Sequence, residues 1–381
     1  MPAGPMTREF RAAERAAHIG NPTAFGGFGG REFIRAAADS LAIRMGTPPK
    51  QVHPAAADFR EMPLTAMAGL CLNAAGQSVV GKSRSSVIHA AMTTSDFPEL
   101  LGTTANRSLV TRFEALVSDH RQLCESGNLV DFKESKVVNV SFLPGLERKY
   151  EGSEIKFGAI TDGAESYRLA TYARGMIFTR EAMINDDLDA FGALLRTAAN
   201  AAARLERDLV FGVLTGNPTM ADGTALFHAN RANLDSTHAT TGVAGLGTAR
   251  ALMRKQKDSS GGFVLTNPRF IVCPVAEEAT AEALVASLTF RPEANVEQQT
   301  PGWVKALVVV ADPRLDESDA ADWYLLSDPA VAPVIRLGYL NGVTVPTVEQ
   351  DADFDRDTMK FKIRFDIACT AVGYAGAVKM A

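Results

Sequence analysis

The feature that most constrains this chain is one long helix predicted at residues 188–214. Its apolar positions follow the 3.6-residue helical period: Leu188, Phe191, Leu195, Ala198, Ala202, Leu205, Leu209 and Val213. About 26 residues rising ~1.5 Å each give a rod of roughly 39 Å. Its narrow, alanine-rich stripe predicts close packing against a sheet, and no catalytic cluster lies within it.

Both ends of the helix are marked in the sequence, by a capping signal at the start and a stop signal at the end. Asn185-Asp186-Asp187 supplies N-capping side chains and favourable negative charge, and Gly216-Asn217-Pro218 ends the helix. Near the C-terminus, Met359, Phe361, Ile363, Phe365 and Ile367 alternate with Lys360, Lys362, Arg364 and Asp366. This alternation predicts a half-buried strand that returns beside the long helix.

A charged hairpin is predicted before the helix. Lys136–Phe142 is strand-like, and Asp162-Gly163 is a hairpin-turn signal between Glu154–Ile160 and Glu165–Tyr172. A hairpin with so few apolar residues is unstable by itself. We therefore expect it to project and to be stabilised by a neighbour; a solvated loop is the alternative.

The rest of the chain divides into a loosely specified beginning and a mixed α/β stretch. Residues 1–60, with breakers at Gly26–Gly30 and Thr47–Lys50, predict an extended or partly helical arm with little core of its own. Further predicted helices are Leu64–Leu72, Ser83–Ala91, Ser108–Glu125, Thr248–Lys257 and Ala276–Leu288. Predicted strands are Phe270–Cys273, Val304–Val310, Trp323–Leu326 and Val334–Leu340. Together these elements predict an α+β fold.

Composition excludes several classes of protein. The 381 residues suggest roughly two or three domains, and a net charge of −5 argues against a dedicated nucleic-acid binder. The four cysteines, Cys71, Cys124, Cys273 and Cys369, lack the spacing of a metal site and predict buried, reduced thiols. No apolar run reaches the ~18 residues of a membrane span, and the polar N-terminus does not resemble a signal peptide.

One motif raises the alternative that the protein is a nucleotide-hydrolysing enzyme. Gly76–Ser83 fits the phosphate-binding pattern GxxxxGK[ST], and Leu307–Asp312 resembles the strand and aspartate that hold magnesium. A phosphate loop follows a buried strand, whereas Met62–Ala75 predicts a short helix. The sequence therefore favours a link between two helices over a P-loop nucleotide hydrolase.

Weaker candidates favour structural roles. Gly242–Gly247 (GVAGLG) lacks a preceding strand and predicts a loop before a helix. His228 is expected to tie down a loop by hydrogen bonds. Asp351–Asp357 lacks the glycine and closing glutamate of a calcium loop, which favours a solvated turn. We expect no catalytic, cofactor-binding or metal-binding residues, and no enzyme.

Four blocks of sequence resemble a known family. They are Thr93–Pro98 (TTSDFP), Asp131–Lys133, the block YRLATYARGMIFTREAMINDDLDAF that begins at Tyr167, and Ala221–Leu234. In this order they resemble the major head subunit of Mu-like tailed phages and prophages, which also occurs fused to a prohead protease. The resemblance covers residues 55–381 and implies a major capsid protein of the Hong Kong 97-type fold.

The resemblance also implies a division of the chain. Residues 1–60 would be an N-terminal arm or scaffold-like extension, and 61–142 a helical segment leading into the peripheral domain. The remaining divisions are an extended loop at 143–172, a peripheral domain at 173–219 with spine helix 188–214, an axial domain at 220–345, and a peripheral return strand at 346–381. Lys149 and Lys156 lie in the extended loop, but no asparagine partner for a cross-link is identified.

The implied function is self-assembly into pentamers and hexamers of an icosahedral virion shell around double-stranded DNA. Assembly would occur in the bacterial host cytoplasm, with a portal, a scaffold or prohead protease and a decoration protein as partners. DNA contacts would be non-specific, and no membrane is involved. The alternative within the same fold is an encapsulin-like compartment for protein cargo. Residues 1–55 match least and would be a fused-region remnant, a cleaved prosegment or a retained arm.

Overall fold

The structure is a computed structural model that describes residues 30–138, 148, 150, 164–237, 241–257, 262–286, 289–293, 296–299, 301–353 and 356–381. These residues form two compact units. The first unit takes its described residues from Met1–Leu116, Thr171–Ala203 and Val345–Phe365, and the second from Val117–Ala170, Arg204–Thr344 and Asp366–Ala381. The mixture of helices and strands in each unit confirms the predicted α+β class.

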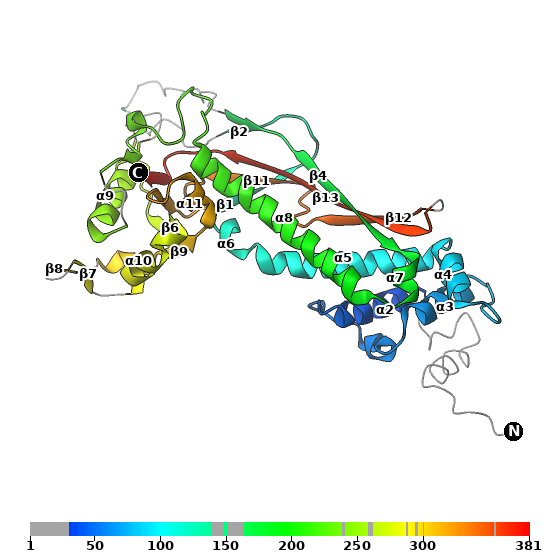
Figure 1. The fold of residues 1–381 in the computed structure, drawn as a ribbon. Coiled ribbons are helices and arrows are strands. Elements are labelled where there is room, and N and C mark those ends of the chain that lie inside the picture. Colours follow the sequence, from blue (N-terminus) through cyan, green and yellow to red (C-terminus); the bar gives the residue numbers. More distant parts are fainter. Residues whose placement is uncertain are drawn as a thin grey trace. The chain divides into compact units, whose positions relative to one another are not determined.

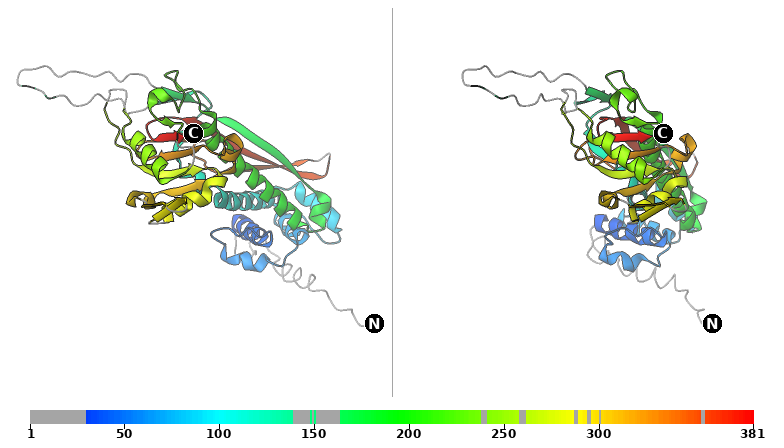
Figure 2. Two further views of the ribbon diagram at one scale, coloured as in Figure 1. Left: turned by 60° about the vertical axis from the view of Figure 1, so that its left-hand side comes forward. Right: turned by 90° about the vertical axis from the view of Figure 1, so that its left-hand side faces the viewer.

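The first unit is built mainly of helices. They are α2 (Gly30–Arg44), η1 (Pro54–Phe59), α3 (Leu64–Ala74), α4 (Arg84–Met92), α5 (Asp96–Leu116), α7 (Arg180–Ile184) and the beginning of α8 (Leu188–Gly216). Figure 2 shows the blue and cyan helices of this unit gathered against one another. Their apolar faces meet in one core that also holds Met359 and Phe361 from strand β13.

Helix α2 corrects the prediction of an arm with little core. Phe33, Ile34, Ala37, Ala38 and Leu41 lie on one face of α2 and are buried in the core of the first unit. The helix packs against α5 and η1. For residues 30–60 the expected partial helix is confirmed, but the expectation of little core is wrong, because the small alanines allow α2 to pack closely against its neighbours.

Helix α5 also differs from its prediction. It begins at Asp96 and ends at Leu116, whereas a helix was predicted at Ser108–Glu125. Asp96 and Glu99 place negative charge in its first turn, and Pro98 is tolerated there because first-turn N–H groups lack helical partners. The end of the predicted helix is instead α6 (Ser118–Arg121) and strand β1 (Cys124–Leu129).

Three strands complete the first unit. Strand β13 (Thr358–Ala371) pairs with β12 (Thr347–Asp353) in antiparallel register, with Val348 opposite Ile363, and also pairs with β4 (Ala170–Thr179). In β13, Met359, Phe361, Ile363 and Phe365 are buried. The predicted alternation of this strand is confirmed, and its odd-numbered side chains face the core.

The second unit contains a sheet with strand order β5-β14-β10-β6-β9. The strands are β5 (Leu234–Asp235), β6 (Pro268–Cys273), β9 (Val308–Ala311), β10 (Trp323–Ser327) and β14 (Ala377–Met380). Helices α9 (Val243–Arg254) and α10 (Val275–Ala286) pack on the sheet face that carries Trp323 and Leu325. The predicted strand Val304–Val310 is partly wrong, because Gly302–Ala306 forms the 3-10 helix η4.

The other end of the second unit holds a parallel pair. Strand β1 lies parallel to β11 (Ile335–Leu340), and β11 lies antiparallel to residues 367–371 of β13. The remaining elements are β2 (Ser135–Val138), β3 (Ala164–Tyr167), β7 (Thr289–Glu293), β8 (Val296–Gln299), η3 (Ala229–Arg231) and α11 (Pro313–Ser318).

The predicted charged hairpin lies mostly outside the described residues. Both Glu154–Ile160 and the turn at Asp162-Gly163 fall outside the described residues. The described part shows β3 paired antiparallel with β2, with Ser135 opposite Tyr167. The strand predicted at Glu165–Tyr172 is divided, since β3 ends at Tyr167 and β4 begins at Ala170. The segment between β2 and β3 therefore leaves and returns through adjacent strands.

Helix α8 confirms the long predicted helix and appears as one uninterrupted helix in Figure 1. The Asp187 carboxylate accepts a hydrogen bond from the Ala190 N–H at 3.1 Å, which is the predicted N-cap. The two units divide this helix between Ala203 and Arg204 and divide β13 between Phe365 and Asp366. The boundaries of the predicted peripheral and axial domains stay predictions.

Candidate functional site

The GxxxxGKS segment is a link between helices. It follows α3 and ends at Ser83, whose side chain caps α4 by accepting a hydrogen bond from the Ser86 N–H at 3.2 Å. Gly76 and Gly81 have φ of +77° and +76°, in the region that favours glycine. Because a helix precedes the segment where a phosphate loop requires a strand, the prediction of an inter-helix link is confirmed.

The carboxylate of Asp312, the candidate magnesium ligand, is used in hydrogen bonds within the protein. Asp312 is fully buried and caps α11, accepting hydrogen bonds from the Arg314 backbone N–H and from its guanidinium, both at 3.0 Å. This explains the Leu307–Asp312 pattern structurally. Within the part of the chain that the structure describes, no group of three or more His, Cys, Asp or Glu side chains is placed to hold a metal ion.

Two other sequence candidates have structural roles. His228 caps η3, its Nδ1 accepting a hydrogen bond from the Asn230 N–H at 3.1 Å, which confirms that it ties down a loop. The glycine-rich stretch Gly242–Gly247 was predicted as a loop, and this is wrong: Gly242 is the N-cap and α9 begins at Val243. Glycine and alanine form the first turn because the apolar face of α9 packs against the sheet.

Acidic residues at the β12–β13 turn form ion pairs. Asp353 pairs with Lys360 at 2.6 Å, and Asp357 pairs with Arg180 at 2.9 Å. Asp357 also lies 3.6 Å from His89. The acidic run therefore fastens the hairpin to α7 and α4 within the first unit.

The cysteines are spread over both units. Cys71, Cys124 and Cys273 are buried and Cys369 is partly buried, and all four are free thiols. Burial raises the pKa of the Cys71 thiol to about 12. This agrees with the prediction of buried, reduced thiols. Among the described residues, no helix combines the length and hydropathy needed to cross a bilayer.

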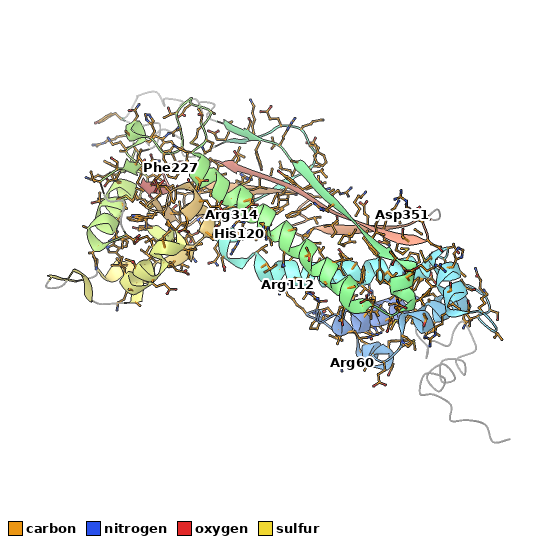
Figure 3. The ribbon with its side chains drawn as sticks, in the orientation of Figure 1. Arg60, Arg112, His120, Phe227, Arg314 and Asp351 are labelled. Atoms are coloured by element: carbon orange, nitrogen blue, oxygen red, sulfur yellow. The ribbon has the colours of Figure 1, made fainter. Side chains whose placement is uncertain are left out.

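A buried polar cluster lies in the second unit around Glu206 of α8, which is fully buried. Arg121 donates to its carboxylate from Nε at 2.5 Å and from Nη2 at 2.8 Å. His120 Nε2 lies 3.0 Å from Oε1, and the Tyr339 hydroxyl donates to the same oxygen at 3.2 Å. Figure 3 labels His120 beside α8. A buried carboxylate needs such partners, because an isolated buried charge is strongly unfavourable.

The charges of this cluster balance locally. Burial alone would raise the pKa of Glu206, but hydrogen bonds from Arg121 and His120 reverse this effect and hold the pKa below its ordinary value. Burial and the nearby Glu206 charge raise the pKa of Tyr339. Arg207 extends the cluster, because its guanidinium bonds Asp119 at 3.2 Å and lies 3.8 Å from Asp312. The cluster joins α8 to α6, β11 and α11 inside one unit.

Sequence reasoning missed this cluster. The predicted stripe included Ala198, Leu205 and Leu209, which are only partly buried. The buried stripe of the second half of α8 includes Glu206, Val210 and Leu214. The available signal was the helical spacing of Glu206 with the buried apolar residues Val210 and Leu214, which follow it by about one and two turns. Its partners come from elements 85 to 133 residues away along the chain, so no local pattern identifies them.

A shallow groove crosses the sheet of the first unit. It has a volume of about 750 Å³ and is called the β4–β12 groove here; its lining residues are Ala173, Arg174, Gly175, Met176, Ile177, Glu349, Gln350, Asp351, Lys360, Phe361 and Lys362. Ile177 is 49% exposed. Lys362 pairs with Glu349 at 2.5 Å, and its hydrogen bond lowers the pKa of that carboxylate.

The two walls of the groove carry further charges. Arg174 on β4 and Asp351 on β12 are exposed, and neither forms an ion pair with another described residue. Figure 3 labels Asp351 on β12. The β4–β12 groove thus combines an exposed apolar side chain with available charges of both signs, which is the character of a protein-contact surface.

Comparison with protein-family models matches residues 163–380, more than half of the chain, to a family described as phage capsid protein. The chain belongs to the phage capsid protein family. This is a family of structural shell proteins, so the capsid protein is a non-enzymatic component of a phage shell. None of the curated proteins matches it significantly.

The capsid protein also has distant structural likenesses. A phage-related protein from Bordetella bronchiseptica is 13% identical, with a TM-score of 0.44 over 71% of this chain and 95% of that chain. A structure of Microbacterium phage Oxtober96 is 10% identical, with a TM-score of 0.46 over 70% and 91%. The holo-SrpI encapsulin complex from Synechococcus elongatus is 10% identical, with a TM-score of 0.42 over 72% and 88%. The assignment of the capsid protein to its family rests on the family model.

Proposed function

We propose that this capsid protein is the major head subunit of a phage or prophage with a Hong Kong 97-type shell, of the Mu-like subgroup. In this proposal it forms pentamers and hexamers that close around double-stranded DNA. The observation that carries the proposal is the family match over residues 163–380. The blocks that resemble Mu-like head subunits, two of which lie inside this range, support the finer assignment.

The architecture supports a shell role in two ways. Helix α8 gives the chain one long helix of 29 residues. Strands β2 and β3 are paired, so residues 139–163 connect two adjacent strands. A connection of 25 residues that returns to its starting point can reach at most about 40 Å, at ~3.3 Å per residue for each half. This length suits a connection to a second copy.

We propose that the extended loop of one copy lies over the β4–β12 groove of a neighbour. The loop segment LERKYEGSEIK carries acidic and basic side chains in close alternation. Arg174 and Asp351 on opposite walls of the groove offer partners of both signs. Complementary charges set the register and partner choice of such contacts more than their total affinity. Closed shells repeat such a heterologous contact around each axis.

Partners beyond the subunit belong to the same proposal. A portal, a scaffold or prohead protease and a decoration protein would act on the assembled shell in the bacterial host cytoplasm. With a net charge of −5, contacts with DNA would be few and non-specific. An encapsulin-like compartment is the alternative, and the family described as phage capsid protein favours the phage shell.

The first experiment examines the purified protein by electron microscopy. We expect closed shells or capsomers, with DNA as the content of particles made during infection or prophage induction. Packaged protein in place of DNA would favour the encapsulin-like alternative. Monomers at all concentrations would overturn the proposed assembly.

The second experiment separates the loop from the fold. Deleting Leu146–Lys156 should leave a monomer that melts like the wild type but does not close shells. The double variant Arg174→Glu with Asp351→Lys should reduce shell yield at least tenfold. Arg254→Glu, an exposed change on α9, is the matched control and should assemble normally. Normal shells from the deletion would refute the role of the loop, and normal shells from the double variant alone would refute the groove as its receiver.

A further inference from the structure

His120 lies between two consecutive side chains of α8. Its side chain is fully buried. Its Nε2 is 3.0 Å from Oε1 of Glu206, and its Nδ1 is 3.4 Å from Nε of Arg207. Both ring nitrogens of this histidine therefore form hydrogen bonds with side chains of α8. All three residues belong to the second unit.

The partners determine which ring nitrogen carries the hydrogen. A guanidinium only donates, so the Arg207 Nε–H requires a lone pair on His120 Nδ1. The hydrogen of the neutral ring is then on Nε2, where it is donated to the Glu206 carboxylate. The observed arrangement thus holds the neutral Nε2–H tautomer, with one bond accepted and one donated.

A proton added to Nδ1 conflicts with this arrangement. It turns the acceptor into a donor that faces another donor and places a third cation beside Arg121 and Arg207. Glu206, the acceptor at Nε2, already receives two bonds from Arg121 and one from Tyr339. The Arg207 side chain can move away from the ring, because it is 30% exposed and also bonds Asp119. Loss of the Arg207–His120 bond is therefore the least unfavourable response.

The neighbouring groups keep constant charges around neutral pH. The charged or titratable groups of the cluster are Asp119 and Arg121 on α6, Cys124 on β1, Glu206 and Arg207 on α8, Asp312 before α11, Tyr339 on β11 and Cys369 on β13. Glu206 has a lowered pKa, whereas burial raises the pKa of Cys124, Cys369 and Tyr339. Histidine is the residue type here that ordinarily changes charge between pH 5 and 8.

We propose that His120 is a proton-operated switch in the second unit: a proton on Nδ1 expels Arg207 from the ring and loosens the contact between α6 and α8. The inference does not depend on the proposed shell type, because every group that carries it lies within one unit of the chain. Under this proposal, the contact between α6 and the second half of α8 weakens as the pH falls.

The decisive measurement is NMR of protein labelled with ¹³C and ¹⁵N in its six histidines. The spectrum of His120→Gln assigns the His120 signals. In the wild type we expect the Nε2–H tautomer at pH 8 and an imidazolium at pH 5. Arg207→Gln removes the opposing cation and should raise the midpoint of the His120 titration. Arg204→Gln, one turn earlier on α8, is the matched control and should leave it unchanged.

Hydrogen exchange of the peptides covering residues 117–121 and 204–211 reports the contact itself. After correction for intrinsic rates, protection in the wild type should fall at least threefold from pH 8 to pH 5. His120→Gln, whose amide still donates to Glu206 and does not titrate, should keep its protection. The switch would be overturned by an Nδ1–H tautomer at pH 8, a ring still neutral at pH 4.5, an unchanged midpoint in Arg207→Gln, or equal loss of protection in His120→Gln.

Discussion

Replacing the Glu206 carboxylate by an amide tests the buried cluster most directly. Glu206→Gln preserves the size of the side chain but removes its charge and converts one acceptor oxygen into an NH2 donor. That donor would face N–H groups of Arg121, which now approach the two carboxylate oxygens at 2.5 and 2.8 Å. The variant therefore leaves the partly buried Arg121 cation without its counter-charge.

The expected loss of stability follows from these contacts. Removing one partner of a buried ion pair destabilises a protein by about 3–5 kcal/mol. Arg121 is 26% exposed and also donates to the Thr344 carbonyl at 2.7 Å, which retains part of its hydrogen bonding. We therefore expect the lower end, about 3 kcal/mol. At roughly 2–4 °C per kcal/mol, the melting temperature of the second unit should fall by about 6–12 °C.

The pH dependence provides an independent check. The pKa of Glu206 in the folded protein is lower than its ordinary value of 4.5. A group with a depressed folded pKa stabilises the fold above its unfolded pKa and loses this contribution as the pH falls through the folded pKa. The part of the difference between wild type and Glu206→Gln that comes from this carboxylate should therefore shrink as the pH falls below about 4.5.

The assay is urea unfolding of the unassembled subunit at pH 7 and pH 3.5, followed by circular dichroism. Tyr339→Phe is the comparator, because it removes one neutral donor at 3.2 Å and should destabilise by only about 0.5–1.5 kcal/mol. A loss below about 1 kcal/mol in Glu206→Gln, or a loss equal at both pH values, would refute the account of the cluster.

Four further predictions concern packing and burial. Gly376→Ala should destabilise the second unit by about 2 kcal/mol or more, because an added Cβ would lie 2.3 Å from the Ala332 carbonyl oxygen. Gly212→Ala, on α8 with nothing within 4 Å, should instead stabilise by about 0.5–1 kcal/mol, and thermal melts compare the two. Phe361→Ala should lower the unfolding free energy of the first unit by about 3–5 kcal/mol, measured in urea. Cys71, with its pKa raised to about 12, should react with iodoacetamide at pH 8 only at the rate of unfolding; fast alkylation in the native state would contradict its burial.

Local patterns predicted the elements that carry strong periodicity and clear ends. Helix α8, strand β13 and the link between α3 and α4 follow directly from residue spacing, caps and glycines. Elements without such marks were missed or misplaced. Strand β1 contains Ser126, Gly127 and Asn128, which do not favour a strand, and it exists because the parallel partner β11 supplies its hydrogen bonds.

Burial was harder to predict than secondary structure. The Ala-rich face of α2 becomes core only because α5 lies against it. Equally, Glu206 is tolerated in the buried stripe of α8 because Arg121, His120 and Tyr339 converge on it. These contacts join residues distant in sequence, and a helical period does not distinguish a buried glutamate from an exposed one.

The amino-acid sequence alone determined the long helix, the returning strand, the inter-helix character of GxxxxGKS and the resemblance to a capsid family. These depend on neighbouring residues, whose spacing and turn chemistry act locally. The tertiary structure decided the division into two units, the core role of α2, the groove beside β4 and the tautomer of His120. Each of these depends on side chains from distant segments meeting in space, where burial changes the energy of charge and the partners determine where a proton lies.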